Sequence, residues 1–173
     1  WYLQQFLKMS YSHISTFDYY FVCDSDTCIL NPIKFWEKDK CLFTMKTEYH
    51  KPYFDTLEKL FSTEVQKSAD GSFIAEHMMF NKHIMSELIK RIQNNQTLEG
   101  YTFYEKIISA VDTNELSYSG FSEYETYGNY ILTYHPDLYQ QRTLRSFRRG
   151  ASVLNSLQEN YVANWVAKNY DII

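Results

Sequence analysis

The chain has 173 residues, of which 45% are hydrophobic and 22% charged, and these values fit one globular domain with its own core. The formal net charge of -4 argues against nucleic-acid binding, because that function needs a basic surface. No run of about 18 apolar residues occurs, so the sequence predicts no transmembrane segment. Three cysteines without a CxxC spacing indicate neither a disulfide framework nor a zinc site, and we expect a cytoplasmic protein.

Helices and strands are expected to alternate from the start of the chain. Apolar spacing predicts an amphipathic helix over residues 1–10. The continuous apolar run 19–23 is typical of a strand buried on both faces, as in a parallel sheet. Another strand is predicted at 41–45, and a helix at 53–61 follows Pro52, a residue that favours helix starts.

The second half of the chain continues this alternation. The patterns predict strands at 72–80 and 138–147, helices at 83–92, 103–111, 122–132 and 152–168, and the start of a last strand at 170–173. Ser122 and Glu125 have the spacing of a capping box, which marks a helix start. We therefore expect a single α/β domain over 1–173, with a mixed or mainly parallel sheet and helices on both sides.

The apolar run 19–23 ends in Asp24-Ser25-Asp26. Two carboxylates one residue apart at a strand end can turn toward one point and supply hard oxygen ligands for a divalent cation. Such a cation can bind a nucleotide diphosphate, and ligands of open α/β sheets sit at the carboxyl ends of strands. The alternative is a solvated acidic turn, but the strongly apolar strand before it favours the functional interpretation.

Several stretches carry a family resemblance. Residues 1–8, 20–27 and Asn31-Pro32 resemble the middle of GT-A-fold glycosyltransferases, where a helix precedes a hydrophobic strand that ends in D-x-D-T. Further matching stretches, at 47–53, 73–80 and 119–130, resemble a bacterial GT-A-like family described only as a domain of unknown function. Together they span nearly the whole chain.

The resemblance implies a Rossmann-like GT-A fold and a transferase that uses Mn²⁺ or Mg²⁺. It implies a nucleotide-sugar donor, with a UDP-sugar expected, and a glycan or lipid-linked acceptor in bacterial surface polysaccharide or glycan synthesis. The reaction would take place in the cytoplasm or at the inner face of the membrane. In GT-A proteins a first βαβ unit ahead of the D-x-D holds the base and ribose, so the resemblance implies that this unit is missing here. Asp24, Ser25 and Asp26 would bind the donor, with Asp24 and Asp26 on the metal ion.

Two polar residues, Glu76 and His77, lie in the predicted strand 72–80. By the resemblance this strand faces the donor sugar, and both side chains could then bind sugar hydroxyls. The alternative is a paired polar couple inside the strand, because an unpartnered Glu is costly to bury.

The catalytic base of an inverting transferase must be a carboxylate near the acceptor hydroxyl. Glu123 and Glu125 are the candidates, although acidic residues also favour a helix N-terminus on electrostatic grounds. Residues two apart do not share a helix face, so one of them is expected to point into the site, and we favour Glu123. Tyr127, Asn129 and Tyr130 are expected to shape the acceptor pocket. A retaining reaction would require no such base.

Two further residues complete the predicted site. His135 is a candidate third metal ligand, as in some GT-A enzymes, or else a structural histidine. Arg148 belongs to an arginine-rich segment and could contact the leaving diphosphate, since Arg binds phosphate in a bidentate manner; otherwise it is part of a solvated face.

Two other functions fit the same residues. One is a non-catalytic carbohydrate-binding or scaffold protein with a degenerate transferase fold, which predicts no metal-dependent nucleotide affinity. The other is a phosphotransferase or nucleotidyltransferase that uses the same two carboxylates, which the block 123–129 does not support.

Overall fold

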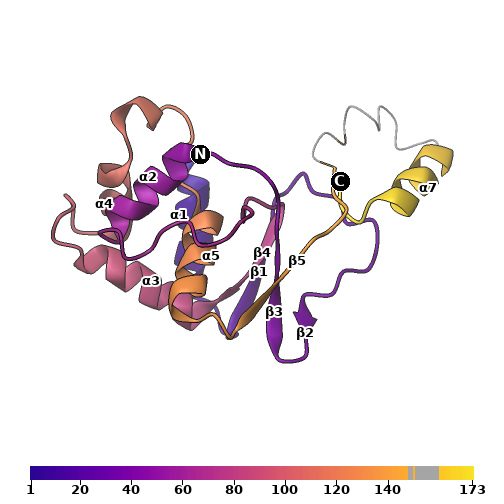
Figure 1. The fold of residues 1–173 in the computed structure, drawn as a ribbon, viewed down its shortest axis with the longest axis horizontal. Helices are drawn as coiled ribbons and strands as arrows, with labels where there is room; N and C mark the ends of the chain where they lie inside the picture. The colour runs from indigo at the N-terminus through magenta and orange to yellow at the C-terminus, as the bar shows by residue number, and fades with distance from the viewer. Residues whose placement is uncertain (148–149, 151–159) are drawn as a thin grey trace.

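The computed structural model describes residues 1–147, 150 and 160–173. In chain order its elements are α1 (Tyr2–Ser10), η1 (Tyr11–His13), β1 (Tyr19–Cys23), β2 (Trp36–Glu37), β3 (Lys40–Thr44), α2 (Lys51–Leu60), β4 (His77–Asn81), α3 (Lys82–Asn94), α4 (Phe103–Ala110), η2 (Thr113–Glu115), α5 (Glu123–Tyr134), β5 (Tyr139–Arg142) and α7 (Asn160–Asn169). Figure 1 shows α1 to α5 grouped on one side of the strands and α7 on the other.

The strands form two small sheets. β1 pairs with β4 in antiparallel fashion, while β3 pairs antiparallel with β2 and parallel with β5. The prediction of a mixed α/β fold with helices flanking a mixed sheet is therefore confirmed, although the described strands divide between two sheets. In the described part of the chain, no helix is long and apolar enough to span a bilayer.

The expectation that β1 lies in a parallel sheet and is buried on both faces is wrong. In the described residues its ladder partner is β4, and Phe21 is 39% exposed. Alternation along the strand explains its composition, because successive side chains point to opposite faces. Tyr20 faces the helices and is buried, whereas Tyr19 and Phe21 contact Trp36 (4.5 Å) and Phe35 (4.7 Å) between ring centroids. Aromatic side chains thus cover the second face of β1, where the apolar run had suggested a layer of helices.

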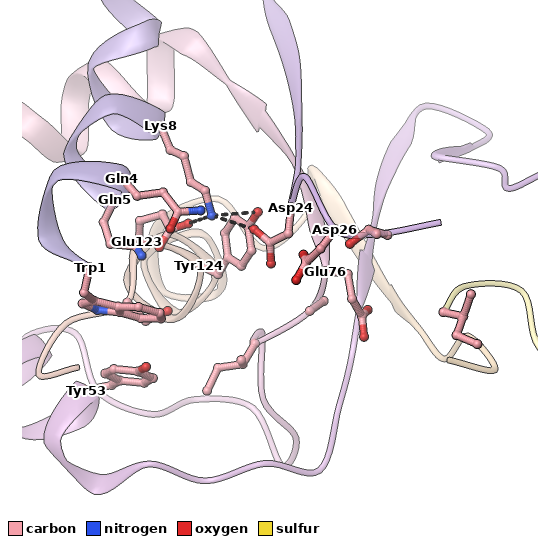
Figure 2. Close-up of a pocket in the computed structure, with 15 residues that line it drawn as sticks. Trp1, Gln4, Gln5, Lys8, Asp24, Asp26, Tyr53, Glu76, Glu123 and Tyr124 are labelled. Carbon is pink, nitrogen blue, oxygen red and sulfur yellow. Dashed lines mark hydrogen bonds and ion pairs between the residues drawn. The ribbon is translucent and has the colours of Figure 1, made fainter. Parts of the chain in front are cut away.

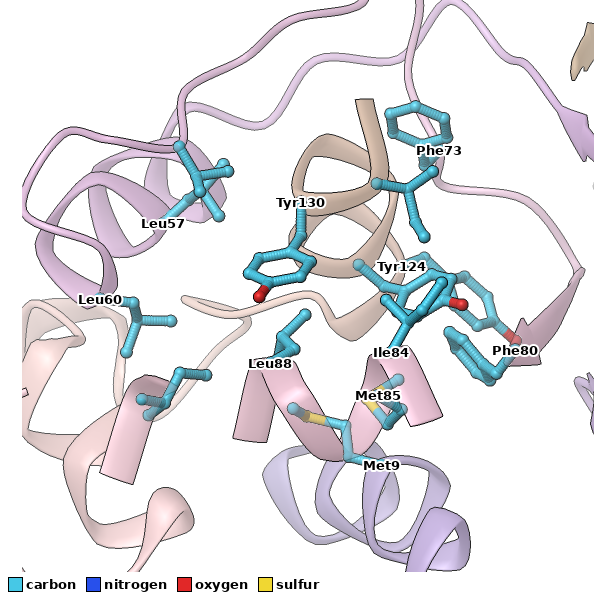
Figure 3. Close-up of a cluster of buried hydrophobic side chains, with 14 of the residues drawn as sticks. Met9, Leu57, Leu60, Phe73, Phe80, Ile84, Met85, Leu88, Tyr124 and Tyr130 are labelled. Atoms are coloured by element: carbon cyan, nitrogen blue, oxygen red, sulfur yellow. The ribbon is translucent and has the colours of Figure 1, made fainter. Parts of the chain in front are cut away.

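The core is built around α5, whose residues from Glu123 to Ile131 are all buried. Figure 3 shows Tyr130 of α5 close to Leu88 of α3, with Leu57 and Leu60 of α2 on the same side of the cluster. The predicted helices in this region are confirmed, and α5 is a central helix whose residues from Glu123 to Ile131 are buried on every side. Its polar residues must therefore find partners inside the protein.

One of these polar residues changes the predicted capping box. The Ser122 hydroxyl accepts a hydrogen bond from Glu125 N (3.2 Å), so Ser122 caps α5 as expected. The reciprocal half is wrong, because the Glu125 carboxylate turns away and accepts from Ser72 Oγ (2.6 Å) and Phe73 N (3.1 Å). The carboxylate therefore fixes the distant segment at Ser72 instead of its own helix start.

Two strands are shorter than the sequence predicts. The predicted strand 72–80 begins only at His77, because Ser72 bridges Lys46 beyond the end of β3 instead of following β1. The predicted strand 138–147 is β5, which ends at Arg142. The last strand is reduced to bridges from Ile172 to Ile29 and to Ser146. Of the helical segment 152–168, the part before α7 lies outside the described residues.

Candidate functional site

The end of β1 places the two aspartates. Asp24 N donates to Glu76 O (2.8 Å), which extends the β1–β4 ladder by one pair beyond Cys23 and His77. Asp24 and Glu76 are therefore cross-strand neighbours on one face. A turn closed by Thr27 N and Asp24 O (3.1 Å) follows at once and carries Asp26.

These acids open onto a cleft of about 270 Å³ between the strand ends, α1 and the start of α5. The residues that line it are Trp1, Gln4, Gln5, Lys8, Asp24, Asp26, Thr27, Tyr53, Ile74, Ala75, Glu76, Ser122, Glu123, Tyr124 and Ile173. Figure 2 shows Asp24, Asp26 and Glu76 on one wall and Trp1 and Tyr53 on the opposite wall, with Glu123 between them.

Lys8 joins two of the cleft carboxylates. Its ammonium lies 2.9 Å from Glu123 Oε1 and 3.1 Å from Asp24 Oδ1, and 4.4 Å from the centre of the Tyr124 ring. Burial lowers the pKa of Lys8, but the charges of Glu123 and Asp24 outweigh that effect and raise it overall. The ammonium is therefore a permanent positive charge at the centre of the cleft.

Glu123 is the most deeply buried acid of the cleft, with 2% of its surface exposed. Burial raises the pKa of its carboxyl, and the ammonium of Lys8 opposes that rise without cancelling it. With its amide nitrogen turned toward the carboxylate, Gln5 also donates to Glu123 Oε1 (2.9 Å). A carboxylate with a raised pKa in a cleft has the properties of a general base.

Glu76 has one oxygen in use and one available. Its Oε1 accepts from Lys46 Nζ (2.8 Å), whereas its Oε2 is buried without a hydrogen-bond partner among the described residues. A buried acceptor without a partner is uncommon and calls for a ligand or water. Glu76 therefore fits the predicted role of binding a polar group in the cleft.

His77 does not share that role, since it points to the opposite side of the strand from Glu76. Its ring is buried between Phe21 and Phe35, with Nε2 3.1 Å from Thr44 Oγ1, and it does not line the cleft. Burial, reinforced by the charge of Arg142, lowers its pKa to about 4. His77 is therefore a neutral core histidine in this structure and lies outside the cleft.

His135 ends α5 on the side away from the cleft. Its Nε2 lies 3.2 Å from Glu87 Oε2. Because α5 has 12 residues, its two ends are about 18 Å apart. The structure therefore places His135 apart from Asp24 and Asp26.

Other predicted residues also lie apart from the cleft. Glu125 faces the interior, where Ser72, Phe73 and Asn129 donate to it, so only Glu123 of the pair lines the cleft. Tyr127, Asn129 and Tyr130 are buried in the core and do not line the cleft. Ser25 is exposed and is not among the lining residues, and Arg148 lies outside the described residues.

The first helix contributes side chains to the cleft that the motifs in the sequence did not indicate. Trp1, Gln4, Gln5 and Lys8 all line the cleft. Their spacing of three and four residues places them on one helix face, and this polar stripe on an otherwise apolar helix is a signal that the sequence contains.

The charges of the cleft favour a cation. Among the described residues, four carboxylate side chains and one ammonium group, that of Lys8, line the cleft. In the residues that the structure describes, no group of three or more His, Cys, Asp or Glu side chains is arranged to hold a metal ion. Asp24 and Asp26 fit an ion that takes one or two carboxylates and completes its shell with phosphate oxygens and water, as Mg²⁺ does. Lys8 contacts Asp24 Oδ1, so Asp26 is the less restricted ligand.

Fold and site together define a mixed α/β domain with an acidic cleft at the end of a strand. The chain matches the family described as "Family of unknown function (DUF6492)" over residues 1–167, and it belongs to that family. Comparisons with curated proteins and with solved structures give no significant match.

Proposed function

We propose that the cleft transfers a sugar from a nucleotide-diphosphate sugar to an acceptor hydroxyl in a metal-dependent reaction. The expected setting is bacterial surface polysaccharide or glycan synthesis on the cytoplasmic side. The observation that carries the proposal is the meeting of Asp24 and Asp26 with Glu123 in one cleft, although about a hundred residues separate them in sequence.

The aspartates suit the donor side. Asp26 would hold Mn²⁺ or Mg²⁺, and Asp24 would reach it with the oxygen that Lys8 does not contact. Such an ion, when bound, binds the diphosphate and neutralises the charge that develops on it as it leaves. The Oε2 of Glu76, which has no hydrogen-bond partner within the described part of the chain, can accept a hydrogen bond from a sugar hydroxyl on the same wall.

Glu123 suits the acceptor side as the general base of an inverting reaction. It would accept the proton of the acceptor hydroxyl as that oxygen attacks the sugar. Its raised pKa favours this uptake, while Lys8 keeps the carboxylate ionised beforehand. Lys8 and Gln5 also fix its orientation, which a base requires before it can act.

One observation favours a second function. Lys8 already neutralises part of the negative charge of Asp24, and a metal cation must compete with Lys8 for that carboxylate. A carbohydrate-binding or scaffold protein with a degenerate transferase site would have such an internal cation in place of a metal ion. It would bind saccharide but show no metal-dependent affinity for UDP.

Calorimetry of UDP binding with and without Mn²⁺ tests the proposal. We expect wild-type affinity to require Mn²⁺ and to fall at least about tenfold in Asp26→Asn, because the ion loses a charged ligand. The matched control is Asp18→Asn. Asp18 is an exposed aspartate that directly precedes the first residue of β1 and pairs with His83. Absence of Mn²⁺-dependent UDP affinity in the wild type, or equal losses in both variants, would remove the transferase proposal.

A further inference from the structure

The wall opposite the aspartates carries two parallel aromatic rings. Trp1 and Tyr53 have ring centroids 6.4 Å apart and planes that differ by 2°. Both line the cleft, and Trp1 is 55% exposed. We call this pair the aromatic shelf; Figure 2 shows it edge-on, with both rings on the far side of the cleft from Asp26.

The shelf is held in place before any ligand binds. Trp1 Nε1 donates to Phe121 O (2.8 Å), which fixes the indole against the start of α5. Tyr53 is buried to 7% exposure and packs edge-on against the ring of His50 at 4.5 Å. A flat apolar surface that is already ordered binds a ligand without a further entropic cost of ordering side chains.

Polar groups border the shelf on the side of the cleft. Gln4 and Glu123 line the same space, and Figure 2 shows Glu123 between the shelf and the wall that holds Asp24 and Asp26. A flat apolar surface with a few polar groups at its edge matches a pyranose ring, which has apolar C–H faces and hydroxyls around its rim. The carboxylate of Glu123 is placed to accept from one of those hydroxyls.

The charge of the cleft selects among saccharides. Even when Lys46, which pairs with Glu76, is counted with Lys8, carboxylates outnumber ammonium groups by four to two. An anionic sugar on the shelf would be repelled by Glu123 and by Asp26, which has no ion-pair partner among the described residues, whereas a neutral one would not.

We propose that the aromatic shelf is the acceptor subsite, and that it binds a neutral pyranose ring by stacking on Trp1. The role of the bound sugar as the acceptor rests on the proposed function, which places the acceptor and the donor on opposite sides of Glu123. The binding of a neutral saccharide to Trp1 does not itself depend on the metal ion.

Tryptophan fluorescence titrations test the shelf directly. The ligands are neutral methyl pyranosides (gluco, galacto and manno), with methyl β-D-glucuronide as the charged match of the gluco compound. The variants are Trp1→Ala and Trp1→Phe, and the matched control is Trp165→Ala, an exposed tryptophan on α7. Thermal melts confirm that each variant is folded, and saturation-transfer NMR supplies a second measure of binding.

We expect at least one neutral pyranoside to bind the wild type and the Trp165→Ala variant equally. Trp1→Ala should weaken that binding roughly 3- to 10-fold, Trp1→Phe less so, and the glucuronide should bind more weakly than its neutral match. Wild-type protein that binds no neutral pyranoside, or a Trp1→Ala variant that binds as the wild type does, would overturn the inference.

Parallel calorimetry with UDP and Mn²⁺ separates this inference from the proposed function. Trp1→Ala should leave UDP affinity unchanged, since the aspartates lie on the other wall. A wild type that binds pyranosides through Trp1 but not UDP would refute the transferase and keep the saccharide site. The reverse result would keep the transferase and refute the shelf.

Discussion

The pairing of Lys8 with Glu123 makes a measurable prediction about stability. The Lys8 side chain is 12% exposed and that of Glu123 2%, so removal of the ammonium leaves a buried, uncompensated carboxylate. Breaking a buried pair from one side costs about 3–5 kcal/mol. The bond from Lys8 to Asp24 adds little, because Asp24 is 36% exposed and exposed pairs contribute only about 0–1 kcal/mol. We therefore expect Lys8→Met to lower the free energy of unfolding at pH 8 by about 3–5 kcal/mol.

Urea unfolding followed by circular dichroism measures this change. Lys8→Met combined with Glu123→Gln should recover most of the loss, because the double variant leaves no buried charge without a partner. The matched control is Lys51→Met. Lys51 lies 2.6 Å from Asp55 but is 69% exposed, and we expect a loss of only about 0.3–0.5 kcal/mol there. Equal losses of unfolding free energy in Lys8→Met and Lys51→Met would show that burial does not determine how much the pair of Lys8 and Glu123 stabilises the fold.

The pH dependence of the same variant gives a second check. Burial raises the pKa of Glu123 above its ordinary 4.5, and Lys8 is the main group that opposes the rise. In Lys8→Met the folded-state pKa climbs further, so the protonated form is favoured in the folded protein and stability falls as pH rises above 4.5. The deficit relative to wild type should therefore be small near pH 5 and largest near pH 8, growing by up to about 1.4 kcal/mol per pH unit. A deficit that shrinks with rising pH would refute the reasoning.

Three further predictions concern α5. Gly128→Ala should lower the free energy of unfolding by about 1–3 kcal/mol, although alanine normally favours a helix. The added Cβ would lie 2.4 Å from the buried Phe73 ring, and urea unfolding would contradict us if it showed a gain. Glu125→Ala should cost about 1–3 kcal/mol by leaving the hydroxyl of Ser72 and the amide of Phe73 without their acceptor, with UDP affinity unchanged. Glu123→Gln should retain UDP affinity but lose sugar transfer. Calorimetry measures the affinity, and a product assay measures the transfer.

Much of the local structure was predictable because its signals are short in range. Apolar spacing at three and four residues located the helices that became α1 to α5, and Ser122 marked the start of α5 through its hydroxyl. The strand before Asp24 was equally clear from its apolar run. What this run could not reveal was its partner, because a strand flanked by aromatic side chains has the same composition as one covered by helices.

The same distinction between local patterns and tertiary contacts applies to the candidate site. The sequence alone determined that two aspartates end a strand and that two glutamates open a helix, because both patterns follow from neighbouring residues. Only the tertiary structure decided which of them meet: helix rotation turned Glu123 toward Asp24 and Glu125 toward Ser72, and strand alternation turned Glu76 into the cleft and His77 out of it. It also brought Lys8 between two of the acids, since contacts across about 16 and 115 residues depend on packing that no local pattern encodes.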